Sequence, residues 1–295
     1  MKKIFITGAS GFIGRALKQR LLTNGYSILE MNSNHDITVS TSFNCFKSEH
    51  IDHIFHLAAK TFVPDSWRHP QSFYQTNVLG TVNVLDFCRG KSVPLTFASS
   101  YLYGQPEKLP ISEDHQIKPN NPYAHSKYLS EQICQFYAKE FGVKTTIIRP
   151  FNVYGIGQSD KYLIPYIIKQ ALHNVDIKVE NLLPKRDYIY LDDLVDFFVL
   201  SMIASKQFAI YNIGSGYSLS VKDVICVVQE ILGINKKIVS DNRIRKNEIY
   251  DVVADISNAN SDIGWSPKHS FYQGVEKIVE YEKRKLNAEA TNTYQ

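Results

Sequence analysis

Two residues near the middle of the chain, Tyr123 and Lys127, have the types and the spacing needed for proton transfer. They stand four residues apart in the stretch YAHSK, and four residues is close to one turn of an α-helix, so a helix would place both on one face. A tyrosine hydroxyl has a pKa of about 10 and is a poor base at neutral pH. A neighbouring ammonium and a positively charged cofactor ring favour the phenolate, so we expect the pKa of Tyr123 to fall toward the working range.

This spacing alone is weak evidence, because a chain of 295 residues with 18 tyrosines produces such pairs by chance. A second pair, Tyr281 and Lys285, lies in YEKRK near the polar C-terminus. The first pair has a possible third partner. Ser99 and Ser100 follow the apolar run PLTFA, at the C-terminal end of an expected strand, which is where ligands collect in open parallel sheets. Either hydroxyl could hold a reacting oxygen beside Tyr123.

A glycine-rich loop, TGASGFIG (Thr7 to Gly14), directly follows the first expected strand and opens the first expected helix. Gly8 allows a tight turn, Gly11 lets a pyrophosphate approach the backbone, and Gly14 permits close packing of the helix. The N–H groups at the start of that helix are free to bind phosphate. In this context the pattern predicts a dinucleotide-binding loop.

The end of the second expected strand, ILEMNSN, bears on the choice of dinucleotide. NAD(H) is usually held by a carboxylate at this tip, whereas NADP(H) needs neutral or basic partners. The tip carries Asn32 and Ser33, while Glu30 lies inside the strand. NADP(H) is therefore the first choice, and NAD(H) stays open. Asp36 could reach the adenine amino group or cap a turn.

Apolar runs of strand length alternate with helical patterns in the first half of the chain. The runs are KIFITG, YSILEMN, HIFHLAA, PLTFASS and KTTIIRPFNVYG, and the helical patterns are Phe12 to Leu22, Ser72 to Cys88 and Pro122 to Phe141. This alternation predicts an α/β fold, a Rossmann-like doubly wound parallel sheet covered on both faces.

After about residue 155 the alternation of strands and helices becomes less regular and gives way to loops and short elements. This change predicts a smaller C-terminal substrate-binding lobe. Its helical patterns are Leu163 to Leu172, Leu191 to Ile203, Val221 to Leu232 and Gln273 to Lys285. We divide the chain into a cofactor-binding domain (1–155), a lobe (156–285) from which some segments return to the main sheet, and a polar, disordered tail (286–295).

Bulk composition excludes several other classes of protein. The chain is 44% hydrophobic and 21% charged, and no apolar run approaches the roughly 20 residues needed to cross a bilayer, so we expect a cytoplasmic protein. Its four cysteines lack metal or disulfide spacing and are read as reduced, mostly buried thiols. The net charge is +4, and the basic residues form no cluster, which disfavours nucleic acid and suits a small anionic ligand.

Taken together, the motifs resemble those of the extended short-chain dehydrogenases/reductases that act on nucleotide-diphosphate sugars. The resemblance runs from Lys3 to about Tyr281. Its motifs, in order, are TGASGFIG, HLAA, NVLGTVNVL, SSYLYG, YAHSK, RPFNVYG, RDYIYLDDL, YNIGSG and ADISNANSDIGWSP. Tyr123 and Lys127 match the family's catalytic pair, and Tyr281 and Lys285 do not.

Roles follow from this resemblance position by position. Ser99 matches the catalytic Ser/Thr, Tyr123 the acid/base, and Lys127 the residue that binds the nicotinamide ribose. The implied cofactor-binding residues are Gly8, Ser10, Gly11, Phe12, Ile13, Gly14, Asn32, Ser33, Asp36, Leu57, Ala58, Ala59, Asn77, Tyr123, Lys127 and Pro150. The implied substrate-binding residues are Ser99, Ser100, Tyr101, Tyr123, Asn152, Tyr162, Leu163, Arg186 and Arg245, with Asn152 and both arginines on the diphosphate.

The resemblance also excludes two of the reactions that family members catalyse. The 4,6-dehydratases of the dTDP-glucose type have Asp-Glu directly after the catalytic residue, where this chain has Ser100 and Tyr101. The epimerising reductases of the GDP-fucose type have a Cys two residues after the catalytic residue, where this chain has Tyr101. The first interpretation is an NAD(P)H-dependent reductase that acts on the C4 keto group of a nucleotide-diphosphate 4-keto-6-deoxyhexose. Such an enzyme would serve deoxysugar biosynthesis for a surface polysaccharide. An NAD-dependent 4-epimerase is the second. A non-catalytic scaffold is the third, which the intact Ser99-Tyr123-Lys127 set disfavours. Family members pair through helices at Gly80 to Cys88 and Pro122 to Phe141, which implies a homodimer.

Overall fold

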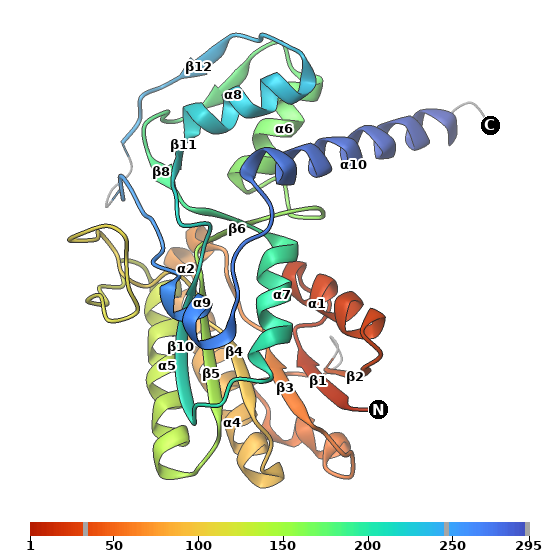
Figure 1. The fold of residues 1–295 in the computed structure, drawn as a ribbon, viewed down its shortest axis with the longest axis vertical. Helices are drawn as coiled ribbons and strands as arrows, with labels where there is room; N and C mark the ends of the chain where they lie inside the picture. The colour runs from red at the N-terminus through yellow and green to blue at the C-terminus, as the bar shows by residue number, and fades with distance from the viewer. Residues whose placement is uncertain (32–34, 245–247, 293–295) are drawn as a thin grey trace.

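The computed structural model of the chain describes residues 1–31, 35–244 and 248–292. Its centre is a parallel sheet of six strands in the order β10-β5-β4-β3-β1-β2 (Figure 1). The strands are β1 (Lys3–Thr7), β2 (Ser27–Met31), β3 (His53–His56), β4 (Leu95–Ala98), β5 (Thr145–Pro150) and β10 (Phe208–Ile213). After β2 the chain crosses to the other side of β1, which creates a switch point where open parallel sheets bind ligands. The predicted doubly wound α/β fold is confirmed.

Side chains of β1 alternate between two apolar layers, because successive residues of a strand point to opposite faces. Ile4 and Ile6 pack with α1 and α7 on one face, and Phe5 packs with α4 and α5 on the other. These covering helices are α1 (Phe12–Thr23), α7 (Leu191–Ser201), α4 (Gly80–Lys91) and α5 (Pro122–Glu140). The sheet is therefore covered on both faces.

The edge strand β10 comes from the second half of the chain. It pairs with β5 over six residues, from Phe208 opposite Thr145 to Ile213 opposite Pro150. Segments following the predicted boundary near residue 155 thus return to complete the main sheet.

The remaining strands and three helices form a lobe above the carboxyl ends of the sheet (Figure 1). Its short strands pair as β6 (Asn152–Tyr154) with β9 (Tyr188–Tyr190), β7 (Ile177–Val179) with β12 (Ile238–Ser240), and β8 (Lys185–Arg186) with β11 (Leu219–Ser220). Its helices are α6 (Leu163–His173), α8 (Val221–Leu232) and α10 (Phe271–Asn292). Their apolar faces share one core, which includes Ile167, Val224 and Val275.

Helix α8 shows why the sequence pattern located its ends so well. The Ser220 side chain accepts from the Asp223 amide, and the Asp223 carboxylate accepts from the Ser220 amide, which together form a capping box. The helix ends at Gly233, whose φ of 65° lies in the left-handed region. It spans Val221–Leu232, as predicted.

Two predictions about helices were wrong. The segment from Asn287 was expected to be disordered, but α10 continues to Asn292: it follows the strong helix formers of KRKL (283–286), and Ala288, Glu289 and Ala290 favour its continuation. The single helix expected from Ser72 is instead three consecutive segments: α3 (Pro70–Phe73), a π-helical stretch η2 (Tyr74–Leu79), and α4. The π-helical stretch brings the Asn77 side chain against α5, as described below.

Shorter helical segments in the described residues are η1 (Ser40–Phe46), α2 (Val63–Arg68) and α9 (Ser257–Ile263). Cys88 and Cys134 are buried, but Cys45 and Cys226 are exposed, so the expectation of mostly buried thiols holds for only half of them. None of the helices in the described ranges is both long enough and apolar enough to span a bilayer.

Candidate active site

The glycine loop packs against the end of β3 so closely that two of its glycines have no room for a side chain. Gly8 has a φ of 77°, and a Cβ there would lie 2.6 Å from the Ala58 amide nitrogen. A Cβ on Gly14 would lie 2.1 Å from the Gly8 carbonyl oxygen. No side chain caps the start of α1, so its first N–H groups stay open to an anion. This cradle fits the pyrophosphate of a dinucleotide.

A cavity of about 250 Å³ opens beside this loop at the predicted cofactor site. Its lining residues are Thr7, Gly8, Ser10, Met31, His35, Asp36, Ile37 and Ala58. Gly8, Ser10, Asp36 and Ala58 were predicted, and the other four were not. His35 and Ile37 flank the predicted Asp36, which is the only signal that could have located them.

Asp36 both lines this cavity and caps a turn. One carboxylate oxygen accepts from the Thr38 amide and hydroxyl, each at 2.8 Å, and these bonds hold the pKa of Asp36 below its usual value. The predicted cofactor residues Asn32 and Ser33 lie outside the described residues.

The other predicted cofactor residues surround the loop without lining that cavity. Phe12 and Ile13 begin α1, Leu57 donates its amide to the Thr7 carbonyl at 3.1 Å, and Pro150 ends β5. Asn77 is buried, and its side-chain amide binds the Lys60 backbone and the Ser126 hydroxyl. Asn77 therefore supports the segment that follows Ala59, and a direct contact with the cofactor stays a prediction.

The predicted catalytic pair lies at the start of α5. The Asn121 side chain accepts from the Ala124 amide at 2.8 Å, and Pro122 occupies the first helical position, so the helix start is well fixed. Lys127 follows Tyr123 by four residues and is only 2% exposed. Its Nζ lies 4.0 Å from the centre of the Phe97 ring, a cation–π contact from inside the sheet.

Burial dominates the electrostatics of both groups. It lowers the pKa of Lys127 to about 7, against the opposing influence of Cys134 and Glu131. It also raises the pKa of Tyr123 to about 12, although the Ser100 hydroxyl acts in the opposite direction. Without a cofactor the pKa of Tyr123 thus lies above its usual value, because a phenolate loses hydration in this environment, and the expected fall beside a bound cofactor ring stays a prediction. Tyr123 carries its proton at neutral pH.

Ser99 and Ser100 stand at the carboxyl end of β4, and both are buried, Ser99 at 5% exposure. The Ser99 Oγ has no hydrogen-bond partner among the described residues, whereas the Ser100 hydroxyl interacts with Tyr123 and lowers its pKa. Buried polar atoms in native proteins are normally paired, so an unpaired hydroxyl here marks a place for a ligand. The structure brings Ser100 next to Tyr123, as the sequence predicted.

Arg186, predicted to bind a diphosphate, is held at the edge of the lobe by groups that sequence reasoning missed. Its Nη2 lies 2.9 Å from a carboxylate oxygen of Glu248, and its Nη1 donates to the Lys185 and Ile249 carbonyls. Glu248 is 62 residues away, so no local pattern could have paired the two. The second predicted arginine, Arg245, lies outside the described residues.

Asp187, next to Arg186, fixes the backbone around it. Its carboxylate is fully buried and accepts hydrogen bonds from the backbone amides of Ser215, Gly216 and Ala254. Burial nevertheless raises its pKa. Asn152 is drawn to the same place, since its side chain donates to the Asp187 carbonyl at 3.2 Å. These contacts join four segments distant in sequence, at residues 152, 187, 215–216 and 254, next to Arg186.

Three more predicted substrate residues lie around this site. The Tyr101 hydroxyl donates to the Gly104 carbonyl at 2.5 Å, so it is engaged in the absence of a ligand. Tyr162 directly precedes α6, is 39% exposed, and lies close enough to Tyr123 to raise its pKa. Leu163 packs on the lobe core. Phe62, which sequence reasoning missed, contacts the Tyr162 ring edge-to-face at 6.4 Å.

Proteins of known sequence and structure resemble the chain over nearly its whole length. It is 29% identical to the GDP-6-deoxy-D-mannose reductase of Pseudomonas aeruginosa over 292 residues, covering 94% of this chain and 96% of the reductase. It is also 29% identical to the UDP-glucose 4-epimerase of Lactobacillus helveticus over 316 residues, covering 94% of each chain.

Two solved structures, one of an epimerase and one of RMD, are also similar to this chain over nearly its whole length. A UDP-glucose 4-epimerase from Thermotoga maritima with UDP-glucose superposes with a TM-score of 0.91 at 28% identity, covering 96% of this chain and 99% of the other. RMD from Pseudomonas aeruginosa complexed with NADPH gives 0.90 at 28% identity, covering 96% and 100%.

The sequence model of the NAD dependent epimerase/dehydratase family matches residues 4–214, which include the glycine loop, the two serines and the Tyr123–Lys127 pair. Its relatives use nicotinamide cofactors and include epimerases and reductases of nucleotide sugars. The chain belongs to the NAD dependent epimerase/dehydratase family.

Proposed function

We propose that the protein reduces the C4 keto group of a nucleotide-diphosphate 4-keto-6-deoxyhexose, using NADP(H) in preference to NAD(H). The observation that carries this proposal is the arrangement at the end of β4 and the start of α5. There a protonated, half-buried Tyr123 lies beside the Ser100 hydroxyl, and the buried Ser99 Oγ next to it in the chain has no hydrogen-bond partner among the described residues. Reduction of a ketone needs a proton donor at the forming alkoxide, and Tyr123 is in the protonation state that can supply it.

Each residue has a defined task in this reaction. The nicotinamide, when bound, supplies a hydride to C4. Ser99 donates a hydrogen bond to the C4 oxygen and holds it beside Tyr123, which transfers its phenolic proton to that oxygen as negative charge develops. Lys127 binds the ribose hydroxyls and its ammonium stabilises the phenolate left behind. The carbonyl gains one hydride and one proton and leaves as an alcohol.

The preference for NADP(H) is supported by the uncharged tip of the second strand and by the NADPH bound to RMD at 28% identity. The second candidate function is NAD-dependent 4-epimerisation of a UDP-sugar, favoured by the likeness to the Thermotoga maritima epimerase. Both reactions use the same three residues, so only the fate of the cofactor separates them.

The test is the absorbance of reduced nicotinamide when cofactor-stripped protein meets NADPH or NADH and a panel of 4-keto-6-deoxy sugars on dTDP, GDP, CDP and UDP. We expect stoichiometric consumption, and a Tyr123→Phe variant that binds NADPH normally but turns over about 10²–10⁴-fold more slowly. No consumption, together with protein-bound NAD and conversion of UDP-glucose to UDP-galactose, would contradict the reductase and support the epimerase. Neither reaction would contradict both.

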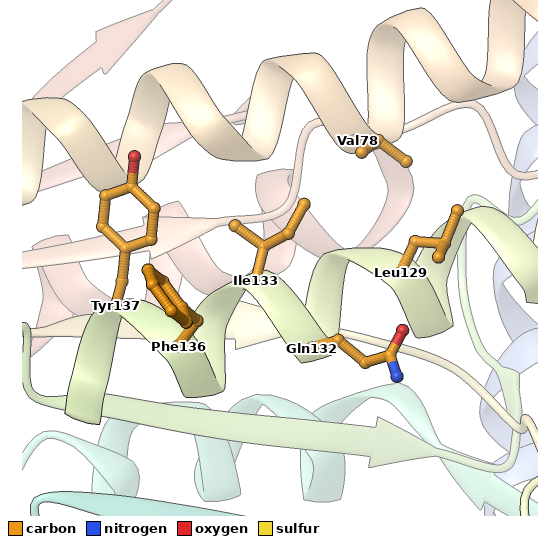
Figure 2. Close-up of a pocket in the computed structure, with 6 residues that line it drawn as sticks. All are labelled: Val78, Leu129, Gln132, Ile133, Phe136 and Tyr137. Carbon is orange, nitrogen blue, oxygen red and sulfur yellow. The ribbon is translucent and has the colours of Figure 1, made fainter. Parts of the chain in front are cut away.

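We also propose that the protein forms a homodimer through α4 and α5. An apolar hollow of about 440 Å³ lies along α5 beside the end of η2, directly before α4, and Figure 2 shows its side chains. It is lined by Val78, Leu129, Gln132, Ile133, Phe136 and Tyr137. Phe136 is 56% exposed, and such a grouping of apolar side chains on a surface is typical of an interface. A second copy presenting the same helices would bury it by two-fold symmetry.

An Ile133→Asp substitution is expected to convert the dimer to a monomer, because a carboxylate buried at the centre of an apolar interface loses its hydration. Mass measured by light scattering after size-exclusion chromatography reads this directly. Ile203→Asp, on an isolated residue that is 74% exposed, is the control and should stay dimeric. A wild-type protein that elutes as a monomer at micromolar concentration would refute the dimer.

A further inference from the structure

A chain of buried hydrogen bonds leads from the glycine loop into the sheet through His56. The Thr7 hydroxyl lies 2.8 Å from His56 Nδ1, and His56 Nε2 lies 3.0 Å from the Thr81 hydroxyl. Thr81 in turn donates to the Asn77 carbonyl at 2.5 Å. All four side chains are buried, so water does not compete for these bonds.

The chain continues from Asn77 to the catalytic helix. The Asn77 side-chain amide donates to the Ser126 hydroxyl at 2.8 Å, and that hydroxyl donates to the carbonyl of Tyr123 at 2.7 Å. Ser130, one turn further along α5, donates to the Asn77 carbonyl at 2.8 Å. His56 therefore stands midway between the loop that would hold the pyrophosphate and the backbone of the predicted acid.

The donors and acceptors in this chain fit only one arrangement of protons. Because the Thr81 hydroxyl proton goes to the Asn77 carbonyl, Thr81 must accept from His56, so Nε2 carries the imidazole proton. Nδ1 is then an acceptor for Thr7, whose oxygen accepts from the Ala58 amide at 3.3 Å. The chain runs in one direction from β3 to α5.

The surroundings of His56 keep it neutral. Burial lowers its pKa to about 3, and the charge of Lys127 acts in the same direction. The Phe97 ring lies between these two groups, 5.4 Å from the His56 ring and 4.0 Å from the Lys127 ammonium. A second proton on His56 would also face the Thr7 hydroxyl, whose proton already points at Nδ1.

We propose that His56 is a positioning residue, whose directed hydrogen-bond chain sets the separation between the bound dinucleotide and the Tyr123–Lys127 pair. This proposal rests on the proposed function only in that Tyr123 and Lys127 act on hydride transfer. It does not depend on which nucleotide sugar is the substrate. Misplacement of reacting groups by about 1 Å slows an enzyme by up to 10²-fold, so a small shift of α5 has a measurable effect.

The same sheet offers a matched control on its opposite face. His53 Nε2 lies 2.9 Å from the Thr96 hydroxyl, which lies 3.0 Å from the Ser201 hydroxyl, and Ser201 donates to the Phe198 carbonyl. This second chain is equally buried but ends in α7, away from the catalytic helix. Thr81→Val and Thr96→Val each remove one hydroxyl without changing side-chain volume, and each leaves one buried imidazole N–H unpaired.

The experiment compares wild type, Thr81→Val, Thr81→Ser and Thr96→Val in the dimeric holoenzyme. We expect Thr81→Val to lower kcat about 10-fold or more, with a larger primary isotope effect from 4-deuterated NAD(P)H and little change in KM. Thr81→Ser, which keeps the hydroxyl, should stay within about 3-fold of wild type. Thr96→Val should lower the melting temperature as much as Thr81→Val while keeping kcat and the isotope effect.

A second measurement needs no substrate: the rate of amide hydrogen exchange over residues 124–130 of the cofactor-free protein. Faster exchange in Thr81→Val than in Thr96→Val supports the proposal. Equal kinetics and equal exchange in the two valine variants would overturn it and leave His56 with a purely structural role. A wild type that turns over no sugar nucleotide would overturn the proposed function, and the exchange arm would then decide the positioning role by itself.

Discussion

Replacing Lys127 with methionine is expected to abolish turnover and, at the same time, to make the cofactor-free protein more stable. Methionine keeps the length of the side chain and its contact with Phe97 but removes the ammonium that binds ribose and stabilises the phenolate. We expect turnover to fall about 10²–10⁴-fold. A pKa lowered to about 7 corresponds to at most roughly 5 kcal/mol of free energy lost by burying the charged form. The methionine variant does not incur this loss.

The stability gain should depend on pH in a defined direction. Between pH 7 and 10.5 the unfolded chain keeps the Lys127 proton while the folded protein has lost it, so wild-type stability rises with pH across this window. The advantage of the variant is therefore greatest below pH 7 and shrinks as the pH approaches 10.5. Catalysis and stability have opposite requirements at this position.

Urea unfolding of cofactor-free wild type and Lys127→Met at several pH values measures this effect. Lys139→Met lies on the same helix, but its side chain is 81% exposed and it should change the free energy of unfolding by less than about 0.5 kcal/mol at any pH. A Lys127→Met protein that is less stable than wild type at pH 7, or whose stability difference is constant with pH, would show that the buried ammonium is not strained.

Replacing Glu131 with leucine should destabilise the protein by about 3–5 kcal/mol. The Arg149 guanidinium makes a two-pronged contact with the Glu131 carboxylate, with Nη2 at 2.6 Å and Nε at 3.0 Å, and the side chains are 3% and 4% exposed. Removing the carboxylate leaves a buried positive charge whose remaining partners are the Tyr103 hydroxyl and the Glu113 carbonyl. Neutral partners cannot replace the lost hydration.

A double variant, Glu131→Leu with Arg149→Met, separates the pair from the unpaired charge. Because both charges are gone, we expect most of the lost stability to return. Arg68→Met, in an exposed pair with Asp65, is the control and should have little effect. Thermal or urea unfolding measures the free energy of unfolding of wild type, Glu131→Leu, the double variant and Arg68→Met. A double variant as unstable as Glu131→Leu would mean that packing, rather than charge, accounts for the loss.

The features that the sequence predicted well depend on local patterns. Apolar runs and helical spacing located β1, α1 and α8 to within a residue or two, because the residues that fix them are close in sequence. The glycine loop was equally readable, since Gly14 is required by contacts within the loop and Gly8 by its contact with Leu57 and Ala58, which directly follow β3. The Tyr123–Lys127 face followed from helix geometry alone.

The features that were missed depend on residues far apart in the chain. Glu248 pairs with Arg186 across 62 positions, and Asp187 accepts from amides of two separate segments, Ser215–Gly216 and Ala254. The raised pKa of Tyr123 in the cofactor-free protein was also missed, because the loss of hydration in the folded chain cannot be read from its neighbours in sequence. Only the folded chain reveals which charges lose their water.

The edge position of β10 has a consequence for the order in which the protein is made. Residues 208–213 leave the ribosome long after β5, so a nascent chain that already contains the glycine loop, Tyr123 and Lys127 still exposes the open side of β5. Unpaired strand edges of this kind are templates for aggregation. The sheet of the cofactor-binding half therefore cannot be completed before residues 208–213 have been translated, and the edge of β5 stays exposed during that interval.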